Sequence, residues 1–286
     1  MPEGDTIYRT ARALGRALTG KSITRFTSEY AQLARANDDG PFVGQTITQV
    51  EARGKWLLIY FSGGGILATQ MLMSGSWHIY RPGERWQQPH SNARILIETA
   101  DYLAVGFRVP VARLHTQESL TRDRKIPQPA SDVLKEEFNT AAAIDRLKAH
   151  PNDEIAEALL RQDVLAGVGN VFKSEICFLE GLSPFQTVAT LSDHQLERVV
   201  ATARHLLAAN VLEDSGDSVV TYHGRGRRTT QSADPGESLW VYSRKGEPCR
   251  RCGEPIQRAL QGKNARSTYW CPICQPDTEN GTWSDQ

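Results

Sequence analysis

The sequence has no long apolar run, little cysteine and no excess of charge of either sign. No stretch of its 286 residues approaches the roughly 18–20 apolar residues that a membrane span requires. The first residues include acids and lack the apolar core of a secretory signal, so we expect a cytoplasmic protein. Its 33 basic and 33 acidic residues cancel, so only local charge can point to a nucleic acid.

The composition and length are those of an ordinary globular protein with more than one lobe. Hydrophobic residues make up 40% and charged residues 23% of the chain, which argues against wholesale disorder. The chain is also longer than a usual single domain of about 100–200 residues. We therefore expect two lobes, or one lobe with an appended module.

Residues 1–120 predict a helix followed by a β-rich domain. Apolar residues recur at helical spacing over residues 5–18, from Ile7 to Leu18. Between residues 23 and 114, short β-branched and aromatic runs are separated by glycine, proline and asparagine. We expect these runs to form an antiparallel sandwich or barrel.

A helical region and a cysteine module follow. Residues 121–131 contain two prolines and almost no apolar side chains, which is typical of a linker. The helical domain is predicted over residues 132–240 and the cysteine module over 241–280. Ser192 and Gln195 form a capping-box pattern before the last helix. Helices are expected over residues 131–150, 152–162, 169–182 and from 192 onward.

The cysteine spacing predicts a zinc ribbon. Cys249 and Cys252 are followed, after eighteen residues, by Cys271 and Cys274. Two such pairs supply four thiolates for a tetrahedral site, and a site filled by protein leaves no position for water, so one structural Zn²⁺ is expected. A redox dithiol pair or chance spacing are the alternatives. The remaining cysteine, Cys177, lies in an apolar run and is expected in a core.

Basic residues are concentrated near this module. Residues 222–270 contain ten Arg or Lys and four Asp or Glu, which gives this segment a net charge of +6. A solvated loop usually interleaves acids, whereas Arg225 and its neighbours alternate with glycine. The pattern therefore indicates contact with the phosphates of a polyanion such as DNA.

A glycine-rich turn precedes one predicted helix. Gly167, Gly169 and Asn170 stand at the start of the helix over residues 169–182. Backbone N–H groups and the positive end of a helix dipole suit a phosphate. The alternative is a tight turn between helices in which Asn170 only caps.

Five motifs in order resemble the formamidopyrimidine-DNA glycosylase/endonuclease VIII (Fpg/Nei) family. They are MPEG at the start, RGK at 53–55, QMLMSG at 70–75, QDVLAGVGN at 162–170 and ARSTYWCPICQ at 265–275. The resemblance covers nearly the whole chain. It implies an α+β multidomain fold with an N-terminal β-sandwich and flanking helices, a helix–two-turn–helix domain and a C-terminal zinc-ribbon finger.

The resemblance also implies catalytic roles for Pro2 and Glu3. A Met followed by Pro is commonly trimmed, and the freed Pro2 would be a secondary amine with a usable neutral fraction near neutral pH. Such an amine attacks a sugar carbon and forms an iminium. In the family the first proline attacks C1′ and the following glutamate moves protons. Without the other motifs, Pro2 and Glu3 would equally fit the start of a helix.

Further residues match family positions that bind DNA or assist the reaction. Lys55 matches a lysine that contacts DNA, although a loop lysine is normally only solvated. Arg266 matches the finger arginine that grips phosphates, and we count both among the catalytic residues. Asn170 matches a phosphate contact, and Gln70 and Arg225 are further DNA-binding candidates.

A base inside a duplex must be flipped out, and an apolar wedge then fills the gap. Met73, or Leu72 beside it, is the candidate wedge, and the alternative is that Met71 and Met73 are ordinary strand core. The start MPEGDT and the absence of a DPRRFG-like segment favour the endonuclease VIII branch. Asp5 and Thr6 replace the family's usual proline and glutamate, so the next carboxylate of the family has no direct equivalent.

These observations predict a monomeric DNA glycosylase with β,δ-elimination lyase activity. Its expected partner is double-stranded DNA that contains oxidised bases, mainly pyrimidines, or abasic sites, with no membrane contact. An enzyme preferring formamidopyrimidine or 8-oxoguanine is one alternative. A silent damaged-DNA-binding protein is another, and it leaves an N-terminal secondary amine without a use. A zinc-ribbon partner in a protein assembly would leave the basic ribbon unexplained.

Overall fold

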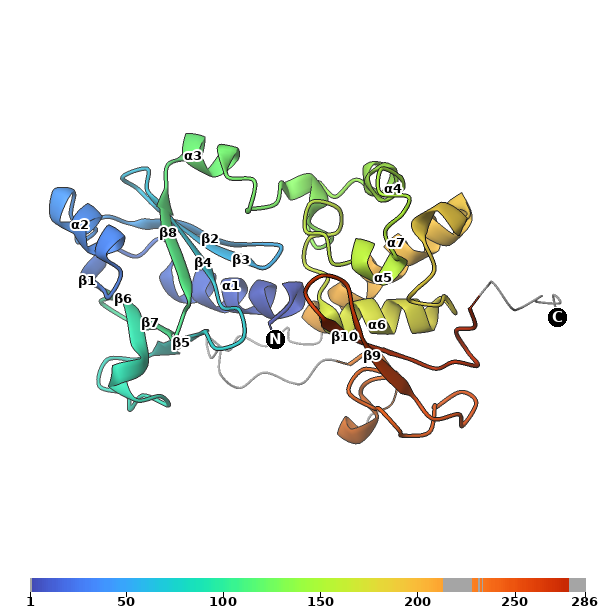
Figure 1. Cartoon of the computed structure of the whole chain (residues 1–286). Coiled ribbons are helices and arrows are strands. Elements are labelled where there is room, and N and C mark those ends of the chain that lie inside the picture. Colours follow the sequence, from blue (N-terminus) through green and yellow to red (C-terminus); the bar gives the residue numbers. More distant parts are fainter. Residues whose placement is uncertain (1, 213–227, 231, 233, 278–286) are drawn as a thin grey trace. The chain divides into compact units, whose positions relative to one another are not determined.

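The computed structural model describes residues 2–212, 228–230, 232 and 234–277. The described residues form two compact units, one within residues 2–128 and one made of 129–212 and the residues from 228 onward (Figure 1). No helix in these ranges is both long and apolar enough to cross a membrane.

The first unit is built on two antiparallel sheets of four strands, as the alternating texture predicts (Figure 1). One sheet has the order β1-β6-β7-β5 and the other β2-β3-β4-β8. The strands are β1 (Ile23–Ser28), β2 (Ile47–Arg53), β3 (Trp56–Phe61), β4 (Ile66–Gln70), β5 (Ser76–Tyr80), β6 (Ala93–Thr99), β7 (Leu103–Phe107) and β8 (Val111–His115).

Helix α1 (Gly4–Leu18) confirms the helix expected over residues 5–18 and packs against β2 and β3. Its predicted apolar face, from Ile7 to Leu18, is buried in the main core of this unit. The chain leaves the helix at Gly20, whose φ of 80° suits glycine. Two further helices, α2 (Ala31–Asp39) and α3 (Gln117–Arg122), were not expected.

The second unit has a helical part and a finger. Its helices are α4 (Thr140–Lys148), α5 (Ile155–Ala158), α6 (Asn170–Leu179) and α7 (Asp193–Leu212), and the finger contains β9 (Gln257–Gln261) and β10 (Arg266–Trp270). The capping box is confirmed, since Gln195 N–H donates to Ser192 Oγ at 3.3 Å and Ser192 N–H to Gln195 Oε1 at 2.9 Å. Short 3₁₀ turns lie at His90–Asn92, Pro129–Ser131, Val188–Thr190 and Pro235–Glu237.

Two predicted helices are shorter than expected. The helix expected over residues 131–150 begins only at Thr140, because the side chain of Asn139 accepts the N–H of Ala142 at 2.9 Å and caps it there. Of the helix expected over 152–162, only α5 forms. Both segments still bury their apolar residues in the core of the second unit.

Candidate functional site

Pro2 and Glu3 stand at the start of α1. Pro2 is half-buried, and the Glu3 side chain is fully buried. The Glu3 backbone begins the helix, with its carbonyl accepting Ile7 N–H at 3.1 Å. The resemblance implies roles for a proline and the glutamate that follows it, and the structure adds that this glutamate is buried. Met1 lies outside the described residues.

Asp5 lies in the first turn of α1. It is fully buried, lies 3.5 Å from the Arg9 guanidinium and accepts the Thr6 hydroxyl at 3.3 Å. Its carboxylate therefore neutralises a helix arginine one turn away. This contact gives the acid at position 5 a charged partner within the helix.

Lys55 lies on the two-residue turn between β2 and β3. Arg53 pairs with Trp56 across the turn, and Gly54 supplies the φ of 58° that such a turn requires. Below it, Arg53 donates to Glu51 at 2.6 Å, and the Tyr60 hydroxyl donates to the same Glu51 oxygen at 2.6 Å. Burial, followed by the bond to Glu51, raises the pKa of Tyr60 far above its usual range. Tyr60 thus stays neutral beside the turn that carries Lys55.

The segment after β4 carries the candidate wedge. Gln70 ends β4 and pairs with Val111, and Met71 is buried. Leu72 has a φ of 44°, and Met73 is 74% exposed. The alternative was that Met71 and Met73 are both strand core. Met71 is indeed buried, but Met73 is exposed, and neither residue lies in a strand.

A second loop lies beside this turn. Ser74 Oγ donates to the Arg108 carbonyl at 3.4 Å, and Arg108 itself has a φ of 47°. A Cβ at Gly75 would lie 2.8 Å from the Met71 carbonyl oxygen and 3.1 Å from Val109 Cα, so only glycine fits. The two loops hold the Leu72–Met73 tip away from the core, where an exposed apolar side chain is available to a partner.

In the second unit, the glycine turn leads into α6. Gln162 fixes the turn, because its side chain donates to the Val168 carbonyl at 3.1 Å and accepts Gly167 N–H at 3.1 Å. The N-cap is Gly169, so the idea that Asn170 only caps is wrong. Instead, Asn170 Nδ2 donates to the Ser267 carbonyl on β10 at 2.7 Å. Asn170 and the exposed Arg266 therefore belong to one surface region.

The four cysteines converge. The sulfur atoms of Cys249, Cys252, Cys271 and Cys274 all lie within 4.8 Å of one another. Four thiolates at this separation fit a tetrahedral Zn²⁺ site that is closed to water. The metal is a structural zinc, one per chain. Cys177 is fully buried, and burial holds the pKa of its thiol at about 12, as suits a core residue.

Several finger arginines bind the protein itself. The Arg251 guanidinium stacks 4.4 Å from the Phe178 ring and donates to the Phe178 carbonyl at 3.2 Å. Arg250 donates to the Leu239 carbonyl at 3.0 Å. Arg250 and Arg251 are therefore engaged within the second unit, although they belong to the basic segment in which the sequence indicates phosphate contacts. Arg225 lies outside the described residues.

Two buried charges were missed in the sequence. Glu175 accepts the backbone N–H groups of Trp240, Val241 and Tyr242, which form the stem of the finger. Lys173 is 0% exposed. Both residues lie in the run KSEICF. A lysine and an acid within an otherwise apolar helix segment could have indicated from the sequence that these charges are buried.

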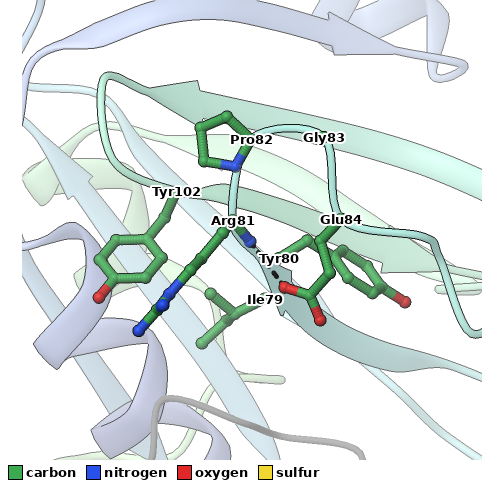
Figure 2. A pocket seen from close by; sticks show the side chains of 7 residues that line it. All are labelled: Ile79, Tyr80, Arg81, Pro82, Gly83, Glu84 and Tyr102. Carbon is green, nitrogen blue, oxygen red and sulfur yellow. Dashed lines mark hydrogen bonds between the residues drawn. The ribbon is translucent and has the colours of Figure 1, made fainter.

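A separate cavity of ≈ 590 Å³ lies at the end of β5 (Figure 2). Arg81, Glu84 and Tyr102 line it, and the Glu84 carboxylate accepts Arg81 N–H at 2.9 Å. None of the predicted site residues borders this cavity.

Comparison with known proteins agrees with this geometry. The formamidopyrimidine-DNA glycosylase N-terminal domain matches residues 1–108, its H2TH domain residues 130–221, and the zinc finger found in FPG and IleRS residues 246–276. "Probable endonuclease 8 2" of Streptomyces coelicolor is 38% identical over 96% of this chain and 94% of its own. "DNA-(apurinic or apyrimidinic site) lyase Nei2" of Mycolicibacterium smegmatis is 38% identical over 96% and 99%.

The fold is also that of a solved relative. The Lactococcus lactis Fpg in complex with abasic-site DNA superposes with a TM-score of 0.79 at 20% identity, covering 96% of this chain and 100% of that one. The chain belongs to the formamidopyrimidine-DNA glycosylase/endonuclease VIII family of bifunctional DNA glycosylases and abasic-site lyases.

Proposed function

We propose that the chain excises oxidised bases, mainly pyrimidines, from double-stranded DNA and cleaves the resulting abasic site in base excision repair. The observation that carries this proposal is Pro2 placed directly before a fully buried Glu3 at the start of α1. We also propose that residues 121–131 link the N-terminal domain to the helical domain, and that the protein acts as a monomer in the cytoplasm.

Pro2 supplies the nucleophile once Met1 is removed. Its nitrogen forms a bond to C1′ while the bond from C1′ to the base breaks, and the base leaves with a proton. The bond from C1′ to the ring oxygen then breaks, the ring oxygen takes a proton, the Pro2 nitrogen loses one, and an iminium joins Pro2 to the deoxyribose. Two eliminations then remove protons from the sugar and release the 3′ and the 5′ phosphate, and water hydrolyses the iminium to free Pro2 and the sugar fragment. Glu3 is the proton carrier, because it is the carboxylate adjacent to the nucleophile and is shielded from bulk water.

The remaining candidates bind and shape the DNA. Lys55, on the turn between β2 and β3, contacts a phosphate near the reacting sugar. Asn170 and Arg266 bind phosphates from the second unit, and a guanidinium suits two phosphate oxygens at once. Met73 enters the stack in place of the flipped base, with Gln70 at the base of the same turn. Arg225 adds to the phosphate contacts.

The preference for pyrimidines rests on the MPEG start, the missing DPRRFG-like segment and relatives named endonuclease 8. Single-turnover excision of dihydrouracil and 5-hydroxycytosine should exceed that of 8-oxoguanine opposite cytosine. Faster excision of 8-oxoguanine would overturn the branch and leave the family membership intact.

The central test is borohydride trapping on a duplex with one abasic site. Wild-type protein should give a covalent adduct, and Pro2→Gly or an uncleaved tag before Pro2 should sharply reduce it. Pro82→Gly, in an exposed loop, is the matched control and should trap normally. An unchanged yield with Pro2→Gly would assign the nucleophile to another amine. Tight binding without any adduct in the wild type would favour a silent damage-binding protein.

A further inference from the structure

Lys173, on α6, is a buried lysine without a conventional partner. Its side chain is 0% exposed, and its Nζ has no hydrogen-bond acceptor among the described residues. Removing an ammonium from water is costly unless nearby charge compensates it. A residue of this kind lowers stability, which points to a use in function.

Four charged or titratable groups act on the Lys173 ammonium. Glu157 on α5 and Glu154 just before α5 favour its charge, Arg266 on β10 opposes it, and Cys177 lies on the same helix. Burial is the largest influence and lowers the pKa of Lys173 to about 8. The lysine is therefore an internal positive charge on which two glutamates and Arg266 act electrostatically.

Both glutamates lie against the finger hairpin. Glu154 Oε2 accepts Gln261 Nε2 at 2.6 Å, at the end of β9. A Cβ at Gly262 would lie 1.7 Å from Glu157 Oε2, so this carboxylate is packed directly on the hairpin turn. That turn leads from Gln261 to Arg266, with which Gln261 pairs. A shift of either glutamate would therefore shift the hairpin that carries Arg266.

Helix α6 holds the other side of the same hairpin. Asn170, one turn before Lys173, donates to the Ser267 carbonyl at 2.7 Å, and Ser267 directly follows Arg266. Further along α6, Ser174 Oγ accepts Tyr269 N–H at 3.4 Å. The charges around Lys173 therefore lie beneath the segment of β10 that carries Arg266.

We propose that Lys173 is a positioning residue for DNA binding. Its buried ammonium holds Glu154 and Glu157 against the finger hairpin and so keeps Arg266 and Asn170 arranged to receive a phosphate. This inference rests on the proposed function, in which those two residues bind DNA. Lys173 needs no contact with DNA of its own, because it acts through the hairpin.

The test uses the full-length, zinc-loaded protein and a duplex with a tetrahydrofuran abasic-site analogue. Lys173→Met keeps the length of the side chain and removes its charge, and it should weaken binding at pH 7 by about tenfold or more, a loss of about 1.4 kcal/mol. Lys173→Arg should recover part of the affinity. Lys148→Met, which removes an exposed lysine paired with Asp193, should bind like the wild type.

The pH profile separates positioning by charge from simple packing. Phosphate nearby favours the protonated lysine, so wild-type affinity should fall as the pH rises through about 8. Free α-amino groups in general also titrate near this pH, so only the part of the fall that disappears in Lys173→Met is assigned to Lys173. Glu157→Gln keeps the lysine and removes one partner, and it should also weaken binding.

If Lys173→Met failed to fold or lost its zinc, Glu157→Gln would decide the question. Normal affinity and an unchanged pH profile in the folded variants would overturn the role of Lys173 alone. A wild-type protein that did not bind the duplex would overturn the proposed function and this role with it.

Discussion

The carboxylate of Glu175 accepts the backbone N–H of Val241 at 2.9 Å, which joins the middle of α6 to the stem of the finger. The same carboxylate accepts the N–H groups of Trp240 at 2.9 Å and Tyr242 at 2.8 Å, and the hydroxyl of Thr229. Glu175 is fully buried. One side chain from the helical part therefore accepts the backbone N–H groups of a turn of the finger that lies outside any strand or helix.

Glu175→Ala should detach this stem. The substitution leaves three backbone N–H groups unpaired, of which that of Val241 belongs to a buried residue. At about 1–3 kcal/mol for a buried unpaired group, the unfolding free energy should fall by at least about 1 kcal/mol. Urea denaturation would measure the loss. Glu180→Gln is the matched control, because its partners Arg198 and Thr202 are side chains that can turn to water. Equal losses in the two variants would contradict this account.

Removal of the zinc should damage the finger before anything else. Cys271→Ser breaks a closed four-thiolate site, which supplies folding energy and has no open position for chemistry. We expect near-stoichiometric zinc in dialysed wild-type protein, less in the variant, and weaker DNA binding. Cys177→Ser, which leaves the four ligands intact, should keep the metal. A metal-free protein with full activity would contradict a structural zinc.

Sequence patterns predicted the elements whose signals are local. The spacing from Ile7 to Leu18 defines α1, and Ser192 with Gln195 defines the start of α7. The start of α4 was misplaced, because apolar periodicity continues on both sides of Asn139 while the cap acts only at that residue. Helix α2 was missed because Leu33 is its only buried residue, so no apolar face repeats along it.

The partners of buried charges could not be predicted in the same way. Glu175 meets backbone groups more than sixty residues away, and Lys173 lies under a hairpin that joins α6 only in the folded chain. The cysteine pairs, by contrast, carry their ligand geometry in short turns, so their spacing was sufficient. Motif resemblance predicts roles for Asn170 and Arg266, and the structure adds the bond from Asn170 to Ser267 beside Arg266.

Met73→Ala should reduce base excision without a loss of stability. Met73 is 74% exposed, so its truncation should change the unfolding free energy by no more than about 0.5 kcal/mol. If Met73 fills the gap left by a flipped base, single-turnover excision should fall by about tenfold or more, while incision at a preformed abasic site should fall less. Val43→Ala, at another exposed apolar residue of the same unit, should change neither rate. Unchanged excision in Met73→Ala would exclude it as the wedge.

Lys173→Met should stabilise the protein while weakening its DNA binding. The pKa of Lys173 is lowered from 10.5 to about 8 in the folded state. Below pH 8 the folded protein therefore carries a protonated lysine in surroundings that disfavour its charge. At 1.36 kcal/mol per pKa unit this cost is on the order of 3 kcal/mol. Between pH 8 and 10.5 the folded state loses the proton more readily than the unfolded state, so the cost shrinks as the pH rises. Urea denaturation should show the variant more stable at pH 7 and the difference narrowing above pH 8, with zinc content verified at each pH. Lys148→Met should show no such trend, and a Lys173→Met variant less stable than the wild type at pH 7 would mean that the buried ammonium is a net stabilising charge.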